Sequence, residues 1–159
     1  MEQYIQPFIK VCRNVFKELV EVNLTVDRPY FSDQKAVHQW DISAIIGLSG
    51  DARGAVVISM RKGLSLRITD LLTGSSHGDI DDDVVDAVGE IVNIIAGNVK
   101  KELEEEFRLI ISLPTIVQGE WHHVKWPSSQ ARIICIPFNM GRDMFNLSVA
   151  IEAFKGKGD

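Results

Sequence analysis

The chain has 159 residues, of which 45% are hydrophobic and 25% charged, and its formal net charge is −5 at pH 7. This length suits one domain that buries roughly 70% of its unfolded surface, so its core needs neither a disulfide nor a metal. The acidic balance excludes a general nucleic-acid-binding protein, because such a protein presents a clustered positive face to phosphates. We expect a single domain over residues 1–154 and a flexible tail at 155–159.

The two cysteines, Cys12 and Cys135, are far apart and each lies in an apolar run. This usage is typical of buried, reduced thiols in a cytoplasmic protein. The first residues lack the basic and apolar segments of a signal peptide. The apolar runs stay below the about 18 residues of a membrane span. We therefore expect a cytoplasmic protein without a membrane segment.

The first half of the chain changes from a helical period to a strand period. Apolar residues recur at helical spacing up to Leu19, and alternation with a period of two follows as far as Pro29. A hairpin signal, Ser49-Gly-Asp, joins two more alternating runs. In chain order we expect a helix at 4–19, a strand at 20–26, a loop at 30–39 and strands at 42–48 and 56–60.

The second half repeats this order after a short helix. That helix is closed by Gly74, which suits a left-handed cap. The next, longer helix has an acidic cluster in its first turn, where the helix dipole favours negative charge. In chain order we expect helices at 64–72 and 81–106, strands at 108–118, 131–138 and 145–151, and a hairpin loop at 139–143.

The repeated order predicts two similar halves within one domain. Strands with one apolar face need helices to cover that face, so we expect an α+β fold: two layers, with an antiparallel-rich sheet covered by helices on one side. In the comparison of the halves, Val11 and Asn14 of the first helix align with Glu90 and Asn93 of the long one. The first copy thus keeps the amide and lacks the acid.

The long helix has polar residues along one line of an otherwise apolar sequence. Asp86, Glu90 and Asn93 are three and four residues apart and so lie on one helix face. Gly89 and Gly97 each cost up to about 1 kcal/mol in a helix relative to alanine, and such glycines often permit the close approach of another surface. We expect Glu90 and Asn93 to be the reactive pair, and Asp86, Gly89 and Gly97 to contact a partner. The simpler alternative is a solvated helix face without a function.

The acidic residues before this stripe resemble a calcium loop in spacing only. Asp79, Asp81, Asp83 and Glu90 fall at ligand positions, but Val84 stands where the sharp turn of the loop needs glycine. The chemistry of a helix start explains the aspartates instead.

The histidines do not form a metal motif. His122 and His123 are adjacent, so their side chains point in different directions, and no cysteine or carboxylate cluster completes a coordination shell. His38 and His77 stand alone in the sequence. We expect no metal to be bound by this chain.

The spacing Asp86-x3-Glu90-x2-Asn93, followed by Pro114, resembles the signature of the CheC/CheX/FliY phosphatases of bacterial chemotaxis. The segments 93–98 and 112–119 fit the same pattern, and 46–50 with 54–58 resembles the hairpin of the family's first half. The likeness spans nearly the whole chain. The spacing from Asn93 to Pro114 is slightly shorter than in the family pattern.

The resemblance implies hydrolysis of the aspartyl phosphate on a CheY-like response regulator. Asn93 would orient the attacking water and Glu90 would pair with a lysine of the regulator. The regulator would supply both the acyl phosphate and Mg²⁺, so this chain would bind no cofactor of its own. A single active helix, with Val11 in the other copy, is closest to the CheX branch, whose proteins are homodimers that join their sheets edge to edge.

Two other functions fit the same sequence. A non-catalytic module would use the same helix to hold a receiver domain or a flagellar-switch component. A ligand sensor would bind a small molecule independently of Glu90 and Asn93.

Overall fold

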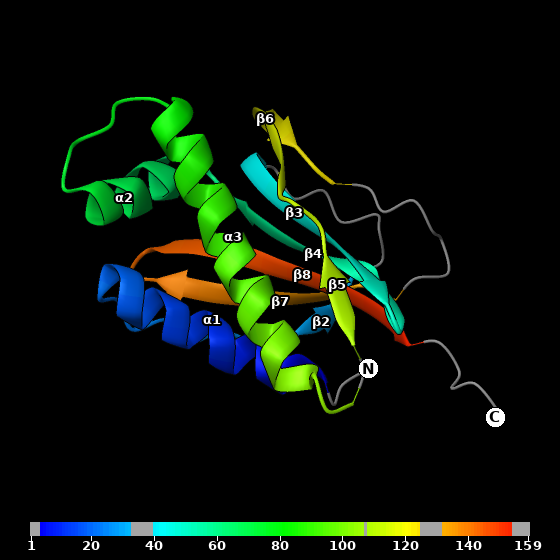
Figure 1. Ribbon diagram of the computed structural model, residues 1–159. Coiled ribbons are helices and arrows are strands. Elements are labelled where there is room, and N and C mark those ends of the chain that lie inside the picture. The colour runs from blue at the N-terminus through cyan, green and yellow to red at the C-terminus, as the bar shows by residue number, and fades with distance from the viewer. Residues whose placement is uncertain (1–3, 33–39, 107, 125–131, 154–159) are drawn as a thin grey trace, which may run out of the picture.

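The computed structural model describes residues 4–32, 40–106, 108–124 and 132–153 (Figure 1). The predicted tail at 155–159 lies outside these residues. The helices are α1 (Ile5–Val20), α2 (Lys62–Thr73) and α3 (Asp82–Leu103). The strands are β1 (Thr25–Val26), β2 (Tyr30–Phe31), β3 (Trp40–Gly50), β4 (Ala52–Met60), β5 (Leu109–Ile111), β6 (Thr115–His122), β7 (Ile134–Met140) and β8 (Asp143–Ala153).

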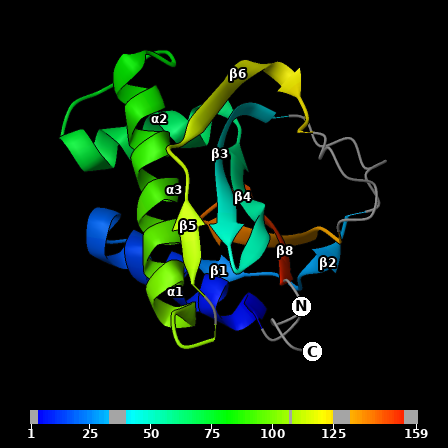
Figure 2. The same ribbon diagram turned by 45° about the vertical axis from the view of Figure 1, so that its right-hand side comes forward.

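The strands form one eight-stranded sheet in the order β1-β7-β8-β4-β3-β5, with β2 also beside β7 and β6 also beside β3. Their pairings are antiparallel. The three helices lie on one face of this sheet (Figures 1 and 2). The predicted two-layer α+β architecture is therefore confirmed.

The sheet topology also confirms the two halves. Strands β4 and β8 pair at the centre of the sheet, and the first two strands of each half pair with a strand of the other half. Thus β1 and β2 pair with β7, while β5 and β6 pair with β3. Because each half completes the sheet of the other, neither half has an independent sheet.

The core lies between the helices and the face of the sheet that they cover. Three buried phenylalanines stack across it: Phe145 lies 5.0 Å from Phe16 of α1 and 5.3 Å from Phe138, measured between ring centroids. Burial of one such side chain stabilises the fold by about 2 kcal/mol. Helix α3 contacts α1 and α2 on one side and β3, β5 and β6 on the other. This packing fixes which side of α3 remains exposed.

The predicted strand at 20–26 is mostly wrong. Val20 is the last residue of α1, and Glu21 ends the helix with a left-handed backbone (φ 56°) whose N–H donates to the Phe16 carbonyl. Val20 and Leu24 both belong to the core, at 5% and 1% exposure, one as the last residue of α1 and the other in the segment that follows it. Their burial imitates the alternation of a strand. Within the predicted segment 20–26, only β1 (Thr25–Val26) forms a strand.

The broken edge strands explain two further differences. The strand predicted at 108–118 is divided into β5 and β6, and Pro114, which has no N–H to donate, ends the break between them. The loop predicted at 30–39 begins with β2, while residues 33–39 lie outside the described ones.

The second face of the sheet is not uniformly wet, contrary to the expectation from alternation. Ser43, Ser59 and Asn146 on this face are 0%, 5% and 2% exposed. Their polar groups bond each other and nearby side chains. Ser43 Oγ lies 2.7 Å from Ser59 Oγ and 2.8 Å from His122 Nε2, and Asn146 donates to the Tyr30 hydroxyl at 3.4 Å. The two serine hydroxyls thus satisfy each other, whereas the buried Asn146 Oδ1 has no hydrogen-bond partner among the described residues. Polar residues in a strand therefore do not by themselves mark exposure.

Gly54 allows a close approach of the two central strands. A Cβ atom placed there would lie 1.8 Å from the Ala150 carbonyl oxygen of β8. We expect Gly54→Ala to lower the free energy of unfolding by about 3 kcal/mol, because the backbones must separate. Gly119→Ala in β6 is the control, since a Cβ there meets nothing within 4 Å. Equal effects of the two changes in urea denaturation would contradict this explanation.

Candidate functional site

The beginning of α3 is fixed by the chemistry that the sequence predicted. Asp81 is the N-cap residue, and its Oδ1 accepts the Val84 N–H at 3.1 Å. Asp82 and Asp83 follow in the first turn, and two lysines lie in the last turn, so both ends suit the helix dipole. The helix ends at Leu103, a few residues before the predicted boundary.

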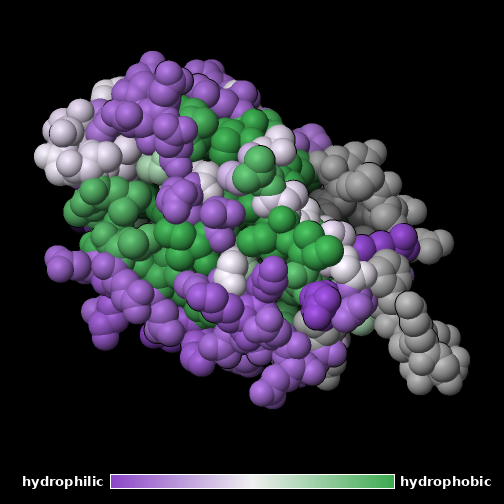
Figure 3. All heavy atoms as spheres, in the orientation of Figure 1, coloured by the Kyte–Doolittle hydropathy of each residue, from purple (hydrophilic) through white to green (hydrophobic). Residues whose placement is uncertain are grey.

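The polar stripe of α3 lies on its exposed side. Asp86 and Glu90 are exposed, and Asn93 and Gly97 are partly exposed. Figure 3 shows this side of the molecule, where polar residues along α3 have hydrophobic areas on both sides. The opposite side of the helix is buried in the core, through Val84, Val88, Ile91, Val92, Ile95 and Val99. The helix therefore has no freedom to turn the stripe away from solvent.

The polar groups of the stripe have no partners within the described part of the chain. Among these residues, none forms a hydrogen bond or ion pair with the side chain of Asp86, Glu90 or Asn93. An ionised glutamate can only accept hydrogen bonds, while an asparagine amide both donates and accepts them. The pair can therefore hold a cation of a partner at Glu90 and orient a water molecule at Asn93, one turn away.

The stripe lies on the exposed side of α3, outside the pockets near α2 and α1. A pocket of about 520 Å³ lies near the start of α2 and includes Asp41, Lys62 and Asp79 in its lining. Another, of about 380 Å³, lies along α1. Neither is lined by Asp86, Glu90 or Asn93. An exposed helix face outside these pockets suits a macromolecular partner better than a small ligand.

Gly89 has a different role from the one predicted. It is buried, and a Cβ atom placed there would lie 3.3 Å from Ile116 Cδ1 and 3.6 Å from Pro114 Cγ. The surface that approaches this glycine closely thus belongs to the chain's own β5–β6 region and not to a partner. At Gly97 a Cβ atom would meet nothing within 4 Å, so this glycine does leave open surface on the stripe.

Comparison with known proteins agrees with this arrangement. Residues 42–139 match the family model described as chemotaxis phosphatase CheX. The chain is 24% identical over 112 residues to the CheY-P phosphatase CheX of Thermotoga maritima, covering 69% of this chain and 70% of that protein. The chain belongs to the CheX family. The family and phosphatase class inferred from the resemblance are thus confirmed.

Solved structures of CheX proteins share this fold over almost their whole length. The chemotaxis protein CheX of Vibrio vulnificus has a TM-score of 0.87 and 27% identity, with 94% of this chain and 99% of that chain covered. The CheX in the CheX–CheY–BeF3–Mg²⁺ complex of Borrelia burgdorferi has a TM-score of 0.80 and 25% identity, with 94% and 97% covered. None of the described helices of this CheX-family chain is both long and apolar enough to cross a membrane.

The comparison of the two halves needs a correction. Val11 is 4% exposed and belongs to the core, so it is not the counterpart of the exposed Glu90. The burial patterns coincide when α1 is shifted by one residue. This shift pairs Phe8, Val11, Cys12, Val15 and Phe16 with Val88, Ile91, Val92, Ile95 and Ala96.

With this alignment, Lys10 and Arg13 occupy the positions of Glu90 and Asn93. The first half therefore has neither the acid nor the amide of the pair. This agrees with a single site in this CheX-family chain, although for a different reason from the one given by the sequence alone.

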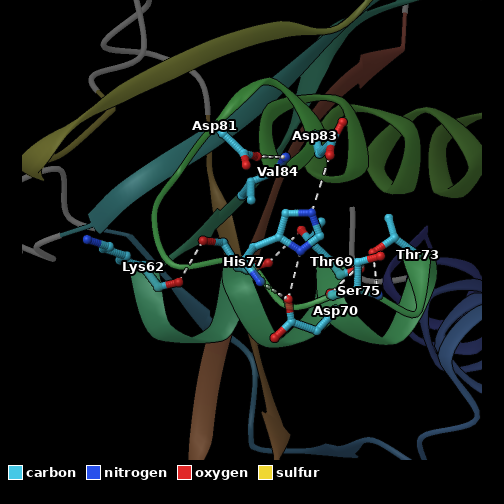
Figure 4. Close-up of polar contacts among 10 residues, drawn as sticks. Lys62, Thr69, Asp70, Thr73, Ser75, His77, Asp81, Asp83 and Val84 are labelled. Carbon is cyan, nitrogen blue, oxygen red and sulfur yellow. Dashed lines mark hydrogen bonds and ion pairs between the residues drawn. The ribbon is translucent and has the colours of Figure 1, made fainter.

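His77 is the residue near the site that sequence reasoning missed. It joins the end of α2 to the start of α3 (Figure 4). Asp70 accepts hydrogen bonds from the His77 backbone N–H and from Nδ1, both at 2.8 Å, and Nε2 lies 3.3 Å from Asp83 Oδ2. The hydrogen bond to Asp70 raises the pKa of His77, with smaller help from Asp83 and Asp81, although burial acts in the opposite direction.

The same cluster brings potential metal ligands together. One ligand atom each of His77, Asp81 and Asp83 lies within 4.8 Å of the others. However, both ring nitrogens of His77 have carboxylate partners, and Asp81 caps the helix. These bonds explain the cluster as a junction between helices. His77 is seven residues from Asp70 and six from Asp83, and it lies in the loop between α2 and α3, where no periodic pattern applies, so sequence spacing did not reveal the junction.

We expect this junction to make stability depend on pH. The carboxylates favour protonated His77 in the folded state, so its stabilising effect is complete below the unfolded pKa of about 6.5 and is lost as pH rises through the higher folded pKa. The stability difference between wild type and His77→Gln should be larger at about pH 5.5 than at about pH 8.5 in urea denaturation. The exposed His123, changed to Gln, is the control. A difference independent of pH would contradict the role of charge.

Proposed function

We propose that this CheX-family chain hydrolyses the aspartyl phosphate of a CheY-like receiver and that Glu90 and Asn93 form its active pair. The observation that supports the pair most directly is its geometry. A carboxylate and a carboxamide lie one turn apart on the exposed side of a helix whose other side is fixed in the core. Their polar groups are not used within the described part of the chain. The Borrelia CheX complex with CheY supports a receiver as the partner.

In this mechanism Asn93 positions water. Its amide oxygen accepts a hydrogen bond from the water, whose oxygen attacks phosphorus opposite the bond to the receiver's aspartyl oxygen. That P–O bond breaks, its electron pair returns to the receiver's carboxylate, and inorganic phosphate leaves. An acyl phosphate is already activated, so alignment of water supplies most of what the reaction needs. The receiver supplies the phosphoryl group and Mg²⁺, and this chain binds no cofactor in the proposal.

Glu90 fixes the docking of the receiver. Its exposed carboxylate pairs with a cationic group of the receiver, and Asp86 adds negative charge one turn earlier. Gly97 leaves room for close approach at the other end of the stripe. The proposal includes a cytoplasmic location and a homodimer, both of which follow from the family resemblance.

We expect Asn93→Ala to slow the receiver's dephosphorylation by about 100-fold, because the attacking water loses its positioning group. Asn98→Ala is the matched control: it removes the same amide from a partly exposed position of α3, five residues further on and on a different face. The measurement is a time course of phosphate loss from a phosphorylated CheY-like receiver. Binding by the wild type without any acceleration would show a non-catalytic module instead.

We expect Glu90→Gln to weaken binding of the receiver about 10-fold, because it removes the charge but keeps the shape. The dissociation constant is measured with the receiver held in its active form by beryllofluoride and Mg²⁺. Salt should weaken binding of the wild type more than binding of this variant, because salt screens the ion pair that only the wild type can form. Glu105→Gln, an exposed carboxylate beyond the end of α3, is the control. Identical salt dependence of wild type and Glu90→Gln would rule out the ion pair.

A further inference from the structure

The break between β5 and β6 is built by specific hydrogen bonds. The Ser112 N–H donates to the Gly47 carbonyl at 2.9 Å, as in an ordinary strand pair. The Gly47 N–H, however, donates to Ser112 Oγ at 2.8 Å, and that hydroxyl donates to the Leu113 carbonyl at 2.9 Å. The side chain thus takes the place of a backbone acceptor. Interruptions of this kind redirect a strand and the side chains that follow it.

The other end of the break packs against helix α3. Pro114 packs against α3 at Gly89, where the missing side chain makes room for it. Leu113 therefore stands between one anchor on β3 and another on α3. It is 85% exposed, and the next most exposed large hydrophobic residue among those described, Ile110, is 55% exposed. The contacts of Ser112 and Pro114 thus hold the backbone on both sides of this exposed leucine.

The residue after Leu113 reaches α3 between two members of the polar stripe. Asp86 lies three residues before Gly89 and Asn93 four residues after it, so the point where Pro114 contacts α3 is flanked by both. Figure 3 shows the hydrophobic area that lies next to the polar residues of α3 on this side. The exposed Leu113 directly precedes this point of contact, so the loop presents an apolar residue next to the helix that carries the polar pair.

The other half of the chain shows that the fold does not require an apolar residue here. Its edge strand is broken in the same way, between β1 and β2, and the break also ends in proline, Pro29. The residue before that proline is the exposed Arg28, where the second half has Leu113. Both loops are exposed, yet only the loop beside the Glu90/Asn93 pair has an apolar residue at this position. A purely structural role does not account for this difference.

We propose that Leu113 is a docking residue that enters an apolar recess of the receiver, next to the cationic group that pairs with Glu90. This inference rests on the proposed function and adds to it the kind of surface that the partner must present. Burial of an apolar side chain next to an ion pair strengthens binding and excludes water around the pair. The fixed loop means that little conformational entropy is lost on binding. Leu113 is thus a binding residue, whereas Asn93 acts on the reacting atoms.

The test separates binding from turnover. We expect Leu113→Ala to raise the dissociation constant for a CheY-like receiver, held by beryllofluoride and Mg²⁺, about 10-fold. Turnover at saturating phosphorylated receiver should equal that of the wild type. Leu113→Met should bind almost as the wild type does. Ile110→Ala is the matched control. Ile110 is an exposed residue of the same edge strand, where it pairs with Ser49. Its side chain points to the face of the sheet that the helices do not cover, because its neighbour Leu109 is buried.

The outcomes distinguish this inference from the proposed function. If the wild type accelerates dephosphorylation and Leu113→Ala binds equally well, the docking role of Leu113 is wrong while the phosphatase proposal stands. Equal losses for Leu113→Ala and Ile110→Ala would also contradict it, because the effect would not be specific to the stripe. If the wild type neither binds the receiver nor accelerates its dephosphorylation, the proposed function fails, and the inference fails with it.

Discussion

The contact of α3 with the broken edge strand at Gly89 is the constraint on which the site depends. Because Gly89 has no side chain, Pro114 and Ile116 pack directly against the helix. The other buried residues of α3 fix its rotation, and this contact fixes its distance from the sheet edge. Exposure of Glu90 and Asn93, and the position of the loop beside them, both follow. A methyl group added at Gly89 would lie 3.3 Å from Ile116 Cδ1, so the Ile116 side chain would have to shift slightly at this contact.

Periodicity predicted the parts of the molecule in which one period governs a long segment. Helix α3, its N-cap and its polar stripe follow from a 3.6-residue repeat and from helix-end chemistry, and the long strands follow from alternation. The errors occur where two constraints compete. Val20 and Leu24 alternate like a strand because the end of α1 and the segment after it each contribute a residue to the core. The contact at Gly89 joins segments far apart in sequence, so no local pattern could reveal it. The junction at His77 is local, but it depends on the path of the loop between two helices, which no periodic pattern encodes.

The two halves share a scaffold and differ in their surfaces. Both have a helix over a sheet whose edge strand is broken at a proline. At the positions where α3 has Glu90 and Asn93, α1 has Lys10 and Arg13, and Lys10 forms an ion pair with Glu102 near the end of α3. The core tolerates either surface because the buried residues alone determine the fold. Function can therefore change in one half without loss of the shared sheet, which both halves must complete.

The exposed position of the site on α3 fits the chemistry proposed for it. An enzyme that must stabilise a highly charged transition state in a low-dielectric environment needs a pocket from which water is excluded. Here the receiver would bring the activated phosphoryl group, its metal and most of the surrounding charge. A surface amide that aligns one water molecule is then sufficient for turnover. Two polar side chains on a helix offer little selectivity by themselves, however. Selectivity must arise from the residues around the pair, and Leu113 is the most exposed apolar residue that the fold holds beside it.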